Sequence, residues 1–430
     1  MIELETKSTG TEFAKVLSEL KSESETMRRV VKQGGYEDDR ASLNLLDDEA
    51  MVEQVLKAAK PYQDANAVVL VGMGGPGLGA KAVQEAFTGV LHNAHHSPSV
   101  FYADTVDPVR TDAILQTAEI YLKAEKKLVV IVATQSGGTT ETIAGAALFH
   151  QLFTTYGVDP VDHMPLVTNK GSTLDTWGKD HGFTRVLVPR KVGGRFSVFS
   201  PIGLFPLAVL GLDIAALVAG SKEFRDAALA GSIEGNAAAL SAAAIAQHYR
   251  AGRNIHVTFL FAPELESLGL WCRQIMAESL GKATDRDGER VNVGITPTIA
   301  IGSRDLHSML QLYMDGPDDK FTTFVRIQNT NDQTVPGTTP FTALVDHLAG
   351  QSLQAVTDAI ADGVVHAYHE RSRPYTVVKL PEVSAETLGA FLQFKMMETM
   401  YLGALLNVNP FDQPGVEAYK IETKRLLATS

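Results

Sequence analysis

The chain has 430 residues, of which 45% are hydrophobic and 20% charged, so it has enough apolar material for the core of a globular protein, and its length fits two domains. Its formal net charge is −12, and no Lys/Arg run could neutralise a row of phosphates, which argues against nucleic acid as a partner. Cys272 is the single cysteine and cannot form an intramolecular disulfide, and the N-terminus lacks the features of a secretory signal, so we expect a cytoplasmic protein.

The first half of the chain has the pattern of alternating strands and helices. Residues 1–60 carry no motif and are predicted to form one or two amphipathic helices that pack on the first domain. Residues 67–71 (AVVLV) and 128–132 (LVVIV) are continuous apolar runs, typical of parallel strands covered on both faces. Each run ends at a loop rich in Gly, Ser or Thr, and in such sheets the loops at the carboxyl ends of the strands bind the ligand.

Residues 201–220 form the most apolar segment, with nearly the length of a membrane span. They contain Pro206, Gly211 and Asp213, which a membrane-spanning helix does not favour. We therefore predict a buried core helix and its approach, and no membrane segment.

The second half repeats the architecture of the first. An Ala-rich helix at 236–249 is followed by a predicted strand at 255–261 and a helix at 265–280. Further strands are predicted at 298–301, 323–327 and 376–380. The pattern predicts an α/β fold with an N-terminal helical segment at 1–60, a first domain at 61–225 and a second at 226–430, with the boundary inside the helical stretch 215–250.

Residues 72–79 (GMGGPGLG) follow a predicted strand and open a helix, so their backbone N–H groups are able to approach an anion or a sugar closely. Gly74 and Gly75 are the candidate contact residues. A GxGxxG-like string also occurs in dinucleotide sites and in plain turns. The acidic ribose ligand of a dinucleotide site is not evident here, because Asp104 lies too far along and Glu85 falls inside the helix.

Residues 134–142 (TQSGGTTET) form a second loop, again directly after a strand. Its hydroxyls and N–H groups suit a phosphate monoester at a helix N-terminus. The alternative is a capping loop without a ligand. The candidate residues for binding the substrate or its phosphate are Thr134, Gln135, Ser136, Thr139 and Glu141.

These loops resemble the GIGGSxLG and SKSGTTTE segments of the glucose-6-phosphate isomerase family. Residues 192–197 (VGGRFS) resemble the family's GGRYS segment, 271–282 (WCRQIMAESLGK) resemble WxxQLxxESxGK, and 304–308 (RDLHS) resemble its histidine motif. Residues 403–420 (GALLNVNPFDQPGVEAYK) follow the family's C-terminal signature from end to end. The resemblance implies two sugar-isomerase (SIS) domains, each a mainly parallel sheet between helix layers, with the phosphate loops in the first and the catalytic base in the second.

Moving a proton between neighbouring carbons of a sugar phosphate needs one base, for which a carboxylate suffices. Glu278 lies four residues after Gln274, so the two side chains share a helical face. Periodicity alone would also fit a solvated face. The resemblance implies that Glu278 is the base and that Gln274 contacts the substrate.

The resemblance assigns the other roles. Arg195 would stabilise the enediolate, whose charge develops in the transition state. His307 would open the sugar ring as an acid, with Lys420 assisting at the ring oxygen or carbonyl and Glu141 as an orienting carboxylate. It also implies a homodimer in which His307 is donated across the interface, and no metal or organic cofactor. The implied reaction converts glucose 6-phosphate to fructose 6-phosphate in glycolysis and gluconeogenesis.

Two positions depart from the family pattern. Gln135 stands where the phosphate loop usually has lysine, and Pro76 stands where the first loop has serine. A lost charge-assisted contact costs roughly 1.5–3 kcal/mol, or about one to two decades in affinity, unless Lys81, Lys170 or another cation substitutes. We therefore expect a weaker Michaelis constant or a related sugar phosphate.

Several alternatives stay open at this point. One is an isomerase with shifted or broadened specificity, for example toward mannose 6-phosphate, or the isomerase half of a system that some bacteria fuse to transaldolase. Another is a non-catalytic sugar-phosphate sensor, which would not need Glu278 and Arg195 in these motifs. The first glycine loop alone would also allow a nicotinamide dehydrogenase.

Overall fold

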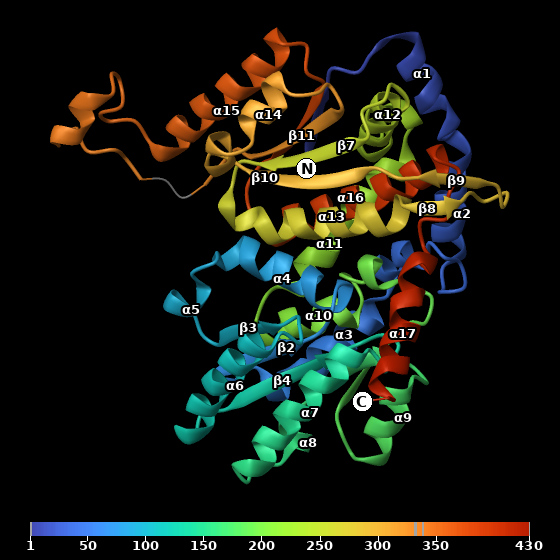
Figure 1. Ribbon diagram of the computed structural model, residues 1–430, viewed down its shortest axis with the longest axis vertical. Helices are drawn as coiled ribbons and strands as arrows, with labels where there is room; N and C mark the ends of the chain where they lie inside the picture. Colours follow the sequence, from blue (N-terminus) through green and yellow to red (C-terminus); the bar gives the residue numbers. More distant parts are fainter. Residues whose placement is uncertain (1, 331–332, 338, 430) are drawn as a thin grey trace. The chain divides into compact units, whose positions relative to one another are not determined.

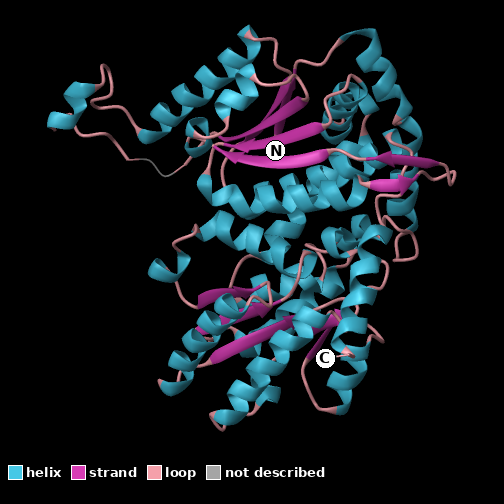
Figure 2. Cartoon of the chain, viewed as in Figure 1, coloured by secondary structure: helices cyan, strands magenta, loops and turns pink. Residues whose placement is uncertain are grey.

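The computed structural model describes residues 2–330, 333–337 and 339–429, which divide into two compact units. The N-terminal unit comprises Glu25–Arg225 and Leu388–Ala390. The C-terminal unit comprises the chain up to Ser24, Asp226–Thr387 and the chain from Phe391 onward. Each unit holds a mainly parallel sheet with helices on both faces, which confirms the predicted α/β class (Figure 2).

The sheet of the N-terminal unit is parallel throughout, in the order β3-β2-β4-β5-β6. Its strands are β2 (Ala67–Val71), β3 (Ser99–Ala103), β4 (Leu128–Ala133), β5 (Leu166–Asn169) and β6 (Arg185–Val188). Every residue of β2 and β4 is buried, as their uninterrupted apolar runs predict for strands covered on both faces. Ala67 pairs with Ser99 on one side and with Leu128 on the other.

Two helix layers cover this sheet. On one face Ile114, Ala118 and Phe149, from two neighbouring helices, pack on the side chains of β2 and β4. On the other face α10 packs against β5 and β6, and α3 and α4 pack against α10. The helices of the unit are α3 (Glu49–Ala59), α4 (Gly75–Thr88), α5 (His92–His95), α6 (Pro108–Lys123), α7 (Thr140–Thr155), α8 (Pro160–His163), α9 (Thr173–Asp180) and α10 (Pro201–Val209), with α2 (Lys21–Gln33) and α11 (Ile214–Ala230) shared with the C-terminal unit.

The order of these strands creates a switch point between β2 and β4. From β2 the chain passes to β3 on one side, and the strand that follows β3 pairs with β2 on its other side. The loops that leave β2 and β4 therefore diverge, which opens a crevice at the carboxyl ends of the strands. Both loops with candidate ligand residues begin there.

The apolar segment 201–220 forms parts of two helices instead of one helix and its approach. Every residue of α10 is buried, and the helix ends before Gly211, which adopts a left-handed φ of +77°. Asp213 then caps α11, because its carboxylate accepts a hydrogen bond from the N–H of Ala216 at 2.9 Å. In the part of the chain that the structure describes, no helix is long and apolar enough to cross a membrane.

The sheet of the C-terminal unit has the order β1-β12-β11-β7-β10. Its parallel strands are β7 (Ile255–Leu260), β10 (Thr296–Ile301), β11 (Lys320–Ile327) and β12 (Tyr375–Leu380), close to the predicted ranges. The helices predicted within residues 1–60 are present as α1 (Gly10–Glu19), α2 and α3, but they follow an unpredicted strand, β1 (Glu3–Thr6), which pairs antiparallel with β12. Residues up to Ser24 belong to this unit and not, as expected from the sequence, to the first domain.

Helices cover both faces of this sheet as well (Figure 1). Side chains of α14 and α15, among them Tyr313, Val364 and Tyr368, pack on Phe324 of β11 and the strands beside it. Helix α13 packs along β10 and β7. The helices are α1 (Gly10–Glu19), α12 (Ala237–Arg250), α13 (Glu266–Leu280), α14 (Leu310–Asp315), α15 (Leu353–Glu370), α16 (Ala385–Leu405) and α17 (Glu417–Leu427). Three residues of α16, Leu388–Ala390, are assigned to the N-terminal unit. Strand β8 (Lys282–Thr284) pairs with β9 (Arg290–Val293) in a hairpin.

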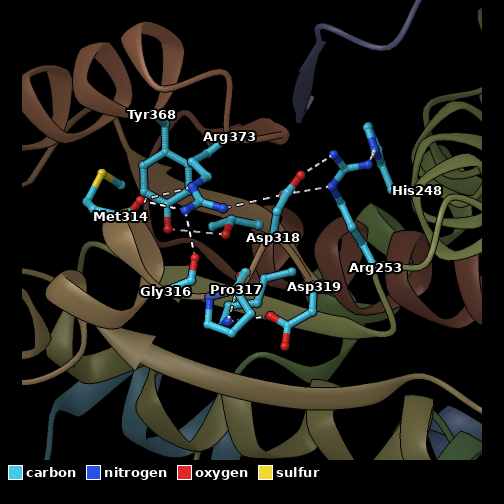
Figure 3. Close-up of polar contacts among 11 residues, drawn as sticks. His248, Arg253, Met314, Gly316, Pro317, Asp318, Asp319, Tyr368 and Arg373 are labelled. Carbon is cyan, nitrogen blue, oxygen red and sulfur yellow. Dashed lines mark hydrogen bonds and ion pairs between the residues drawn. The ribbon is translucent and has the colours of Figure 1, made fainter.

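An ion-pair network connects the segments that precede three of the parallel strands in this unit (Figure 3). Asp318, which precedes β11, binds Arg253 before β7 at 2.5 Å and Arg373 before β12 at 3.5 Å. Arg373 also donates to the carbonyl oxygens of Met314 and Gly316. The hydrogen bond from Arg253 lowers the pKa of Asp318, although partial burial opposes the shift. This network lies at the sheet edge opposite the carboxyl ends.

Candidate active site

The first loop depends on two glycines for its shape. Gly74 caps α4 with a positive φ of +60°, which a residue with a side chain rarely adopts. A Cβ on Gly75 would lie 2.1 Å from the carbonyl oxygen of Gly194, so the loop packs directly on the backbone of the GGRFS segment. Pro76 lies in the first turn of α4, where helix N–H groups have no partner within the helix in any case.

The second loop gathers its hydroxyls at the N-terminus of α7. The Oγ1 atoms of Thr134 and Thr139 are 2.9 Å apart, and Ser136 Oγ lies 3.5 Å from Thr139 Oγ1. Thr139 caps α7 without a side-chain hydrogen bond to the helix, which leaves the first-turn N–H groups available to an anion. Glu141 lies in this first turn and is half-buried. The sequence interpretation leaves out Thr142 as a ligand, although its hydroxyl is buried without a hydrogen-bond partner among the described residues.

Gln135 connects this loop to its neighbours. Its side-chain Nε2 donates to the carbonyl oxygen of Val192 at 2.7 Å, in the segment that leads to Arg195. Its main-chain oxygen accepts a hydrogen bond from the N–H of Asn169 at 3.3 Å. Gln135 thus joins the loop after β4 to the last residue of β5 and to the loop after β6.

The cations named as substitutes for the missing lysine differ in their surroundings. Lys81 lies 4.0 Å from Glu85 and 3.9 Å from Asp104, so carboxylates already balance its charge. Lys170 is exposed in the turn after β5. Arg190, which the sequence interpretation missed, donates from Nε to the carbonyl oxygen of Lys170 at 3.0 Å. Lys170 and Arg190 therefore bring positive charge to the turn that directly follows Asn169, the β5 residue bonded to Gln135.

Arg195 is held in a buried position by a short 3-10 helix, Gly194–Phe196. Only 2% of its surface is exposed, and its guanidinium lies 5.6 Å from the centre of the Phe196 ring. Ser197 closes the turn by donating from Oγ to the carbonyl oxygen of Gly194 at 2.6 Å. A guanidinium fixed in this way is preorganised for an anion, since little reorganisation is needed when charge develops.

Glu278 and Gln274 lie side by side on α13, as the spacing predicts. Gln274 Nε2 donates to Glu278 Oε1 at 3.1 Å, and both side chains are half-buried. Gln274 Oε1 is buried without a hydrogen-bond partner among the described residues. The pair therefore presents a carboxylate beside an open acceptor, which suits a sugar hydroxyl.

His307 lies at the other end of α13. It closes the short helix Arg304–His307 after β10, and Arg304 of this helix pairs with Glu266, the first residue of α13, at 3.0 Å. Glu278 lies twelve residues further on, which corresponds to about 18 Å along a helix. The side chain of His307 is exposed. The structure thus keeps His307 at a distance from the Glu278 of its own chain.

Lys420 lies in the first turns of α17 and pairs with Glu417 of the same helix at 2.7 Å. No residue of α17 is buried. Lys420, His307, Glu278 and Gln274 all belong to the C-terminal unit, whereas Arg195 and both loops belong to the N-terminal unit.

Among the described residues, no group of three or more His, Cys, Asp or Glu side chains is placed to hold a metal ion. Cys272 is buried within α13, and burial raises the pKa of its thiol to about 12. A thiol in this environment stays protonated and is a poor nucleophile.

The chain has two mainly parallel sheets, each between helix layers. Its Gly- and Thr-rich loops lie at a switch point of one sheet, and the candidate carboxylate lies on a separate helix. These features are typical of α/β proteins of the sugar-isomerase type. The tagatose-6-phosphate ketose/aldose isomerase of Escherichia coli shares the fold, with a TM-score of 0.52 over 95% of this chain and 96% of that chain, at 13% identity. The chain belongs to the phosphoglucose isomerase family, whose model matches residues 51–429.

Relatives of this chain agree with that family. It is 34% identical to a glucose-6-phosphate isomerase of Thermus thermophilus over 87% of this chain and 88% of the relative. A crystal structure of a protein from the same species, described as hypothetical, has a TM-score of 0.88, with 32% identity and full coverage of both chains.

Proposed function

We propose that this protein interconverts glucose 6-phosphate and fructose 6-phosphate, in the cytoplasm, as a step of glycolysis and gluconeogenesis. The observation that carries the proposal is the hydrogen-bonded Gln274–Glu278 pair on α13 in a chain of the phosphoglucose isomerase family. The curated relatives named glucose-6-phosphate isomerase cover most of both chains and support the same reaction.

Glu278 acts as the base that removes the proton from C2 of the open-chain aldose and returns it to C1. Its hydrogen bond from Gln274 fixes the orientation of the carboxylate that takes the proton. The negative charge then moves to the sugar oxygens of a cis-enediolate. Arg195 stabilises this charge, and its burial strengthens the interaction because water cannot screen it.

The loops of the N-terminal unit bind the phosphate. The hydroxyls of Thr134 and Ser136 each lie within hydrogen-bonding distance of the Thr139 hydroxyl, as donors grouped for one anion would. The N-terminus of α7 adds the first-turn N–H groups and the helix dipole. Gly74, Gly75 and Gln135 complete the set, with Gln135 acting on the loop backbone through Val192, while Glu141 serves as an orienting carboxylate.

Ring opening requires an acid, and we assign it to His307 of a second subunit, with Lys420 assisting. The support for an intersubunit role is the position of His307 at the opposite end of α13 from Glu278. Phe341 and Leu344, in the segment Pro340–Leu344, are each 78% exposed, which also supports contact with a second copy. Apolar side chains exposed to this degree fit an interface better than a free surface.

An assay coupled to glucose 6-phosphate formation from fructose 6-phosphate tests the function. Glu278→Gln should lower kcat by roughly 10²–10⁴-fold, the usual contribution of a general base. The matched control is Glu264→Gln, an exposed glutamate that precedes the same helix and should leave kcat unchanged. An inactive wild type that binds hexose 6-phosphates would instead support a non-catalytic sensor, and an active Glu278→Gln variant would contradict the choice of base.

The substrate range needs a separate experiment, since Gln135 and Pro76 alter the loops that bind the phosphate and sugar. Wild-type protein is incubated with glucose, mannose and fructose 6-phosphates, and the products are identified by NMR. Conversion of mannose 6-phosphate at a rate comparable to that of glucose 6-phosphate would favour the broadened isomerase.

A further inference from the structure

Lys282, the first residue of β8, has a buried ammonium group surrounded by backbone oxygens. Its Nζ donates to the carbonyl oxygens of Glu278 at 2.8 Å, Ser279 at 2.9 Å and Asp412 at 3.0 Å. The carboxylate of Asp412 lies 3.6 Å away, and only 5% of the lysine side chain is exposed. Lys282 is the last residue of the segment 271–282 (WCRQIMAESLGK), but the sequence does not indicate what this lysine does.

The end of α13 explains why a cation is stable in this place. The last carbonyl groups of a helix have no partner within the helix, and the helix dipole makes this end negative. Gly281, which follows α13, adopts a φ of −73° and not the left-handed conformation that commonly ends a helix. Lys282 therefore takes the place of a glycine cap, and the three N–H bonds of its ammonium match the three carbonyl oxygens.

Two of these carbonyl groups belong to the turn of α13 that carries the base. The third belongs to the C-terminal signature, where Asp412 is followed by Gln413 and, eight positions after Asp412, by Lys420. Segments 130 residues apart in the sequence thus share one ammonium group. Removing the ammonium would remove at once the three hydrogen bonds that it donates to these two segments, and would let the segments shift relative to each other.

We propose that Lys282 is a positioning residue that holds the backbone of Glu278 in register with the C-terminal signature. This role presupposes the isomerase function proposed above. Lys282 acts through backbone oxygens and does not need to touch the substrate. A displaced base still leaves the phosphate loops intact, so the effect should fall on proton transfer and not on substrate binding.

The experiment compares Lys282→Met with Lys282→Arg, which keeps the charge. Lys320→Met is the matched control, because Lys320, the first residue of β11, is also largely buried and donates to the carbonyl oxygen of Pro317, outside both segments that Lys282 joins. We expect Lys282→Met to lower kcat by about 10–100-fold with KM within twofold of wild type. Lys282→Arg should lose less, and Lys320→Met should keep its kcat.

Two further readouts separate positioning from a general loss of stability. With glucose 6-phosphate deuterated at C2, the isotope effect on kcat should rise in Lys282→Met, because proton transfer becomes slower than the other steps. Hydrogen exchange should show the amides of residues 277–281 and 411–413 losing protection together in Lys282→Met but not in Lys320→Met. If Lys282→Met does not fold, Lys282→Arg must show the same pattern to a smaller degree.

A kcat within twofold of wild type in both Lys282 variants would overturn the proposal. A fall in kcat that Lys320→Met shows as well would also overturn it, and so would a fall in kcat accompanied by an equal rise in KM. Failure of the isomerase function itself would be visible separately, as wild-type protein without turnover. The exchange experiment does not depend on turnover and would still decide whether Lys282 couples the two segments.

Discussion

Gln135 donates a hydrogen bond from its side-chain amide to the main-chain oxygen of Val192 at 2.7 Å. The bond joins the loop after β4 to the segment that carries Arg195, so the residue that replaces the family's lysine has a structural contact of its own. The phosphate loop consequently keeps its connection to the GGRFS segment while it lacks the lysine's charge.

This contact leads to a prediction for Gln135→Lys. The substitution gives up one neutral hydrogen bond, worth about 1 kcal/mol, and adds a cation beside the proposed phosphate site. We expect KM for fructose 6-phosphate to fall by about tenfold at low salt, corresponding to about 1.4 kcal/mol, with kcat little changed. The gain should shrink as the salt concentration rises.

The measurement is the KM of wild type and Gln135→Lys at two ionic strengths. Gln116→Lys is the control, because Gln116 is exposed on α6. An unchanged KM for Gln135→Lys would mean that Lys170 and Arg190 already neutralise the phosphate.

Sequence patterns predict the central strands well and the edges poorly. Residues 67–71 are apolar at every position, so only a strand covered on both faces fits them. Strand β1 has the sequence ELET and a half-exposed face, and it is a strand only because β12 offers it an open edge. Such tertiary pairing is not encoded in a four-residue pattern.

The same distinction holds for the site. The Gln274–Glu278 contact follows from a spacing of four on one helix, so periodicity predicts it. The contacts of Gln135 with Val192 and of Lys282 with Asp412 join residues 57 and 130 positions apart. No local pattern records contacts over that separation. Motif matching therefore indicates which residues matter without showing what these two side chains bind.

Acid should destabilise the C-terminal unit through His248. Burial, and then the charge of Arg253, lower the pKa of His248 to about 4, while Asp318 opposes the shift (Figure 3). The unfolded histidine titrates near 6.5, so below that pH the unfolded chain binds a proton that the folded chain excludes. The free energy of unfolding should therefore fall as the pH drops from about 6.5 to about 4.

Replacing His248 with Gln should reduce this loss by about 1–2 kcal/mol, a value discounted for the partial exposure of the side chain. Urea unfolding of wild type and variant at pH 7, 5.5 and 4.5 gives the difference in slope. Exposed His150→Gln is the control. Parallel pH profiles for wild type and His248→Gln would show that the folded protein accepts the proton without cost.

The buried ion pair of α16 should be sensitive to the loss of either partner. Lys395 and Glu398 form a salt bridge with 2% and 0% of their side chains exposed, and Ser241 donates to the same carboxylate at 2.5 Å. Removing one partner leaves an uncompensated charge in the core, so Glu398→Gln should lower the free energy of unfolding by about 3–5 kcal/mol.

The double variant Lys395→Met/Glu398→Gln should recover much of this loss, because it removes both charges. Urea denaturation of the two single variants and the double variant gives the coupling free energy between Lys395 and Glu398. The control is Glu422→Gln, which removes an exposed ion pair with Arg425 and should hardly change the free energy of unfolding. A double variant as unstable as the sum of the singles would contradict this account.

Subunit mixing should reveal whether His307 acts in its own chain or in a partner. His307 lies at the opposite end of α13 from Glu278, so we expect Glu278→Gln and His307→Ala to be nearly inactive alone but to complement each other. In a mixed dimer, one site would combine the intact Glu278 of one chain with the intact His307 of the other. Unfolding the variants together at equal amounts and refolding them should restore about a quarter of wild-type activity, since half of the dimers are mixed and each has one intact site. If His307 served its own chain, every site in the mixture would carry a substitution and no activity would return.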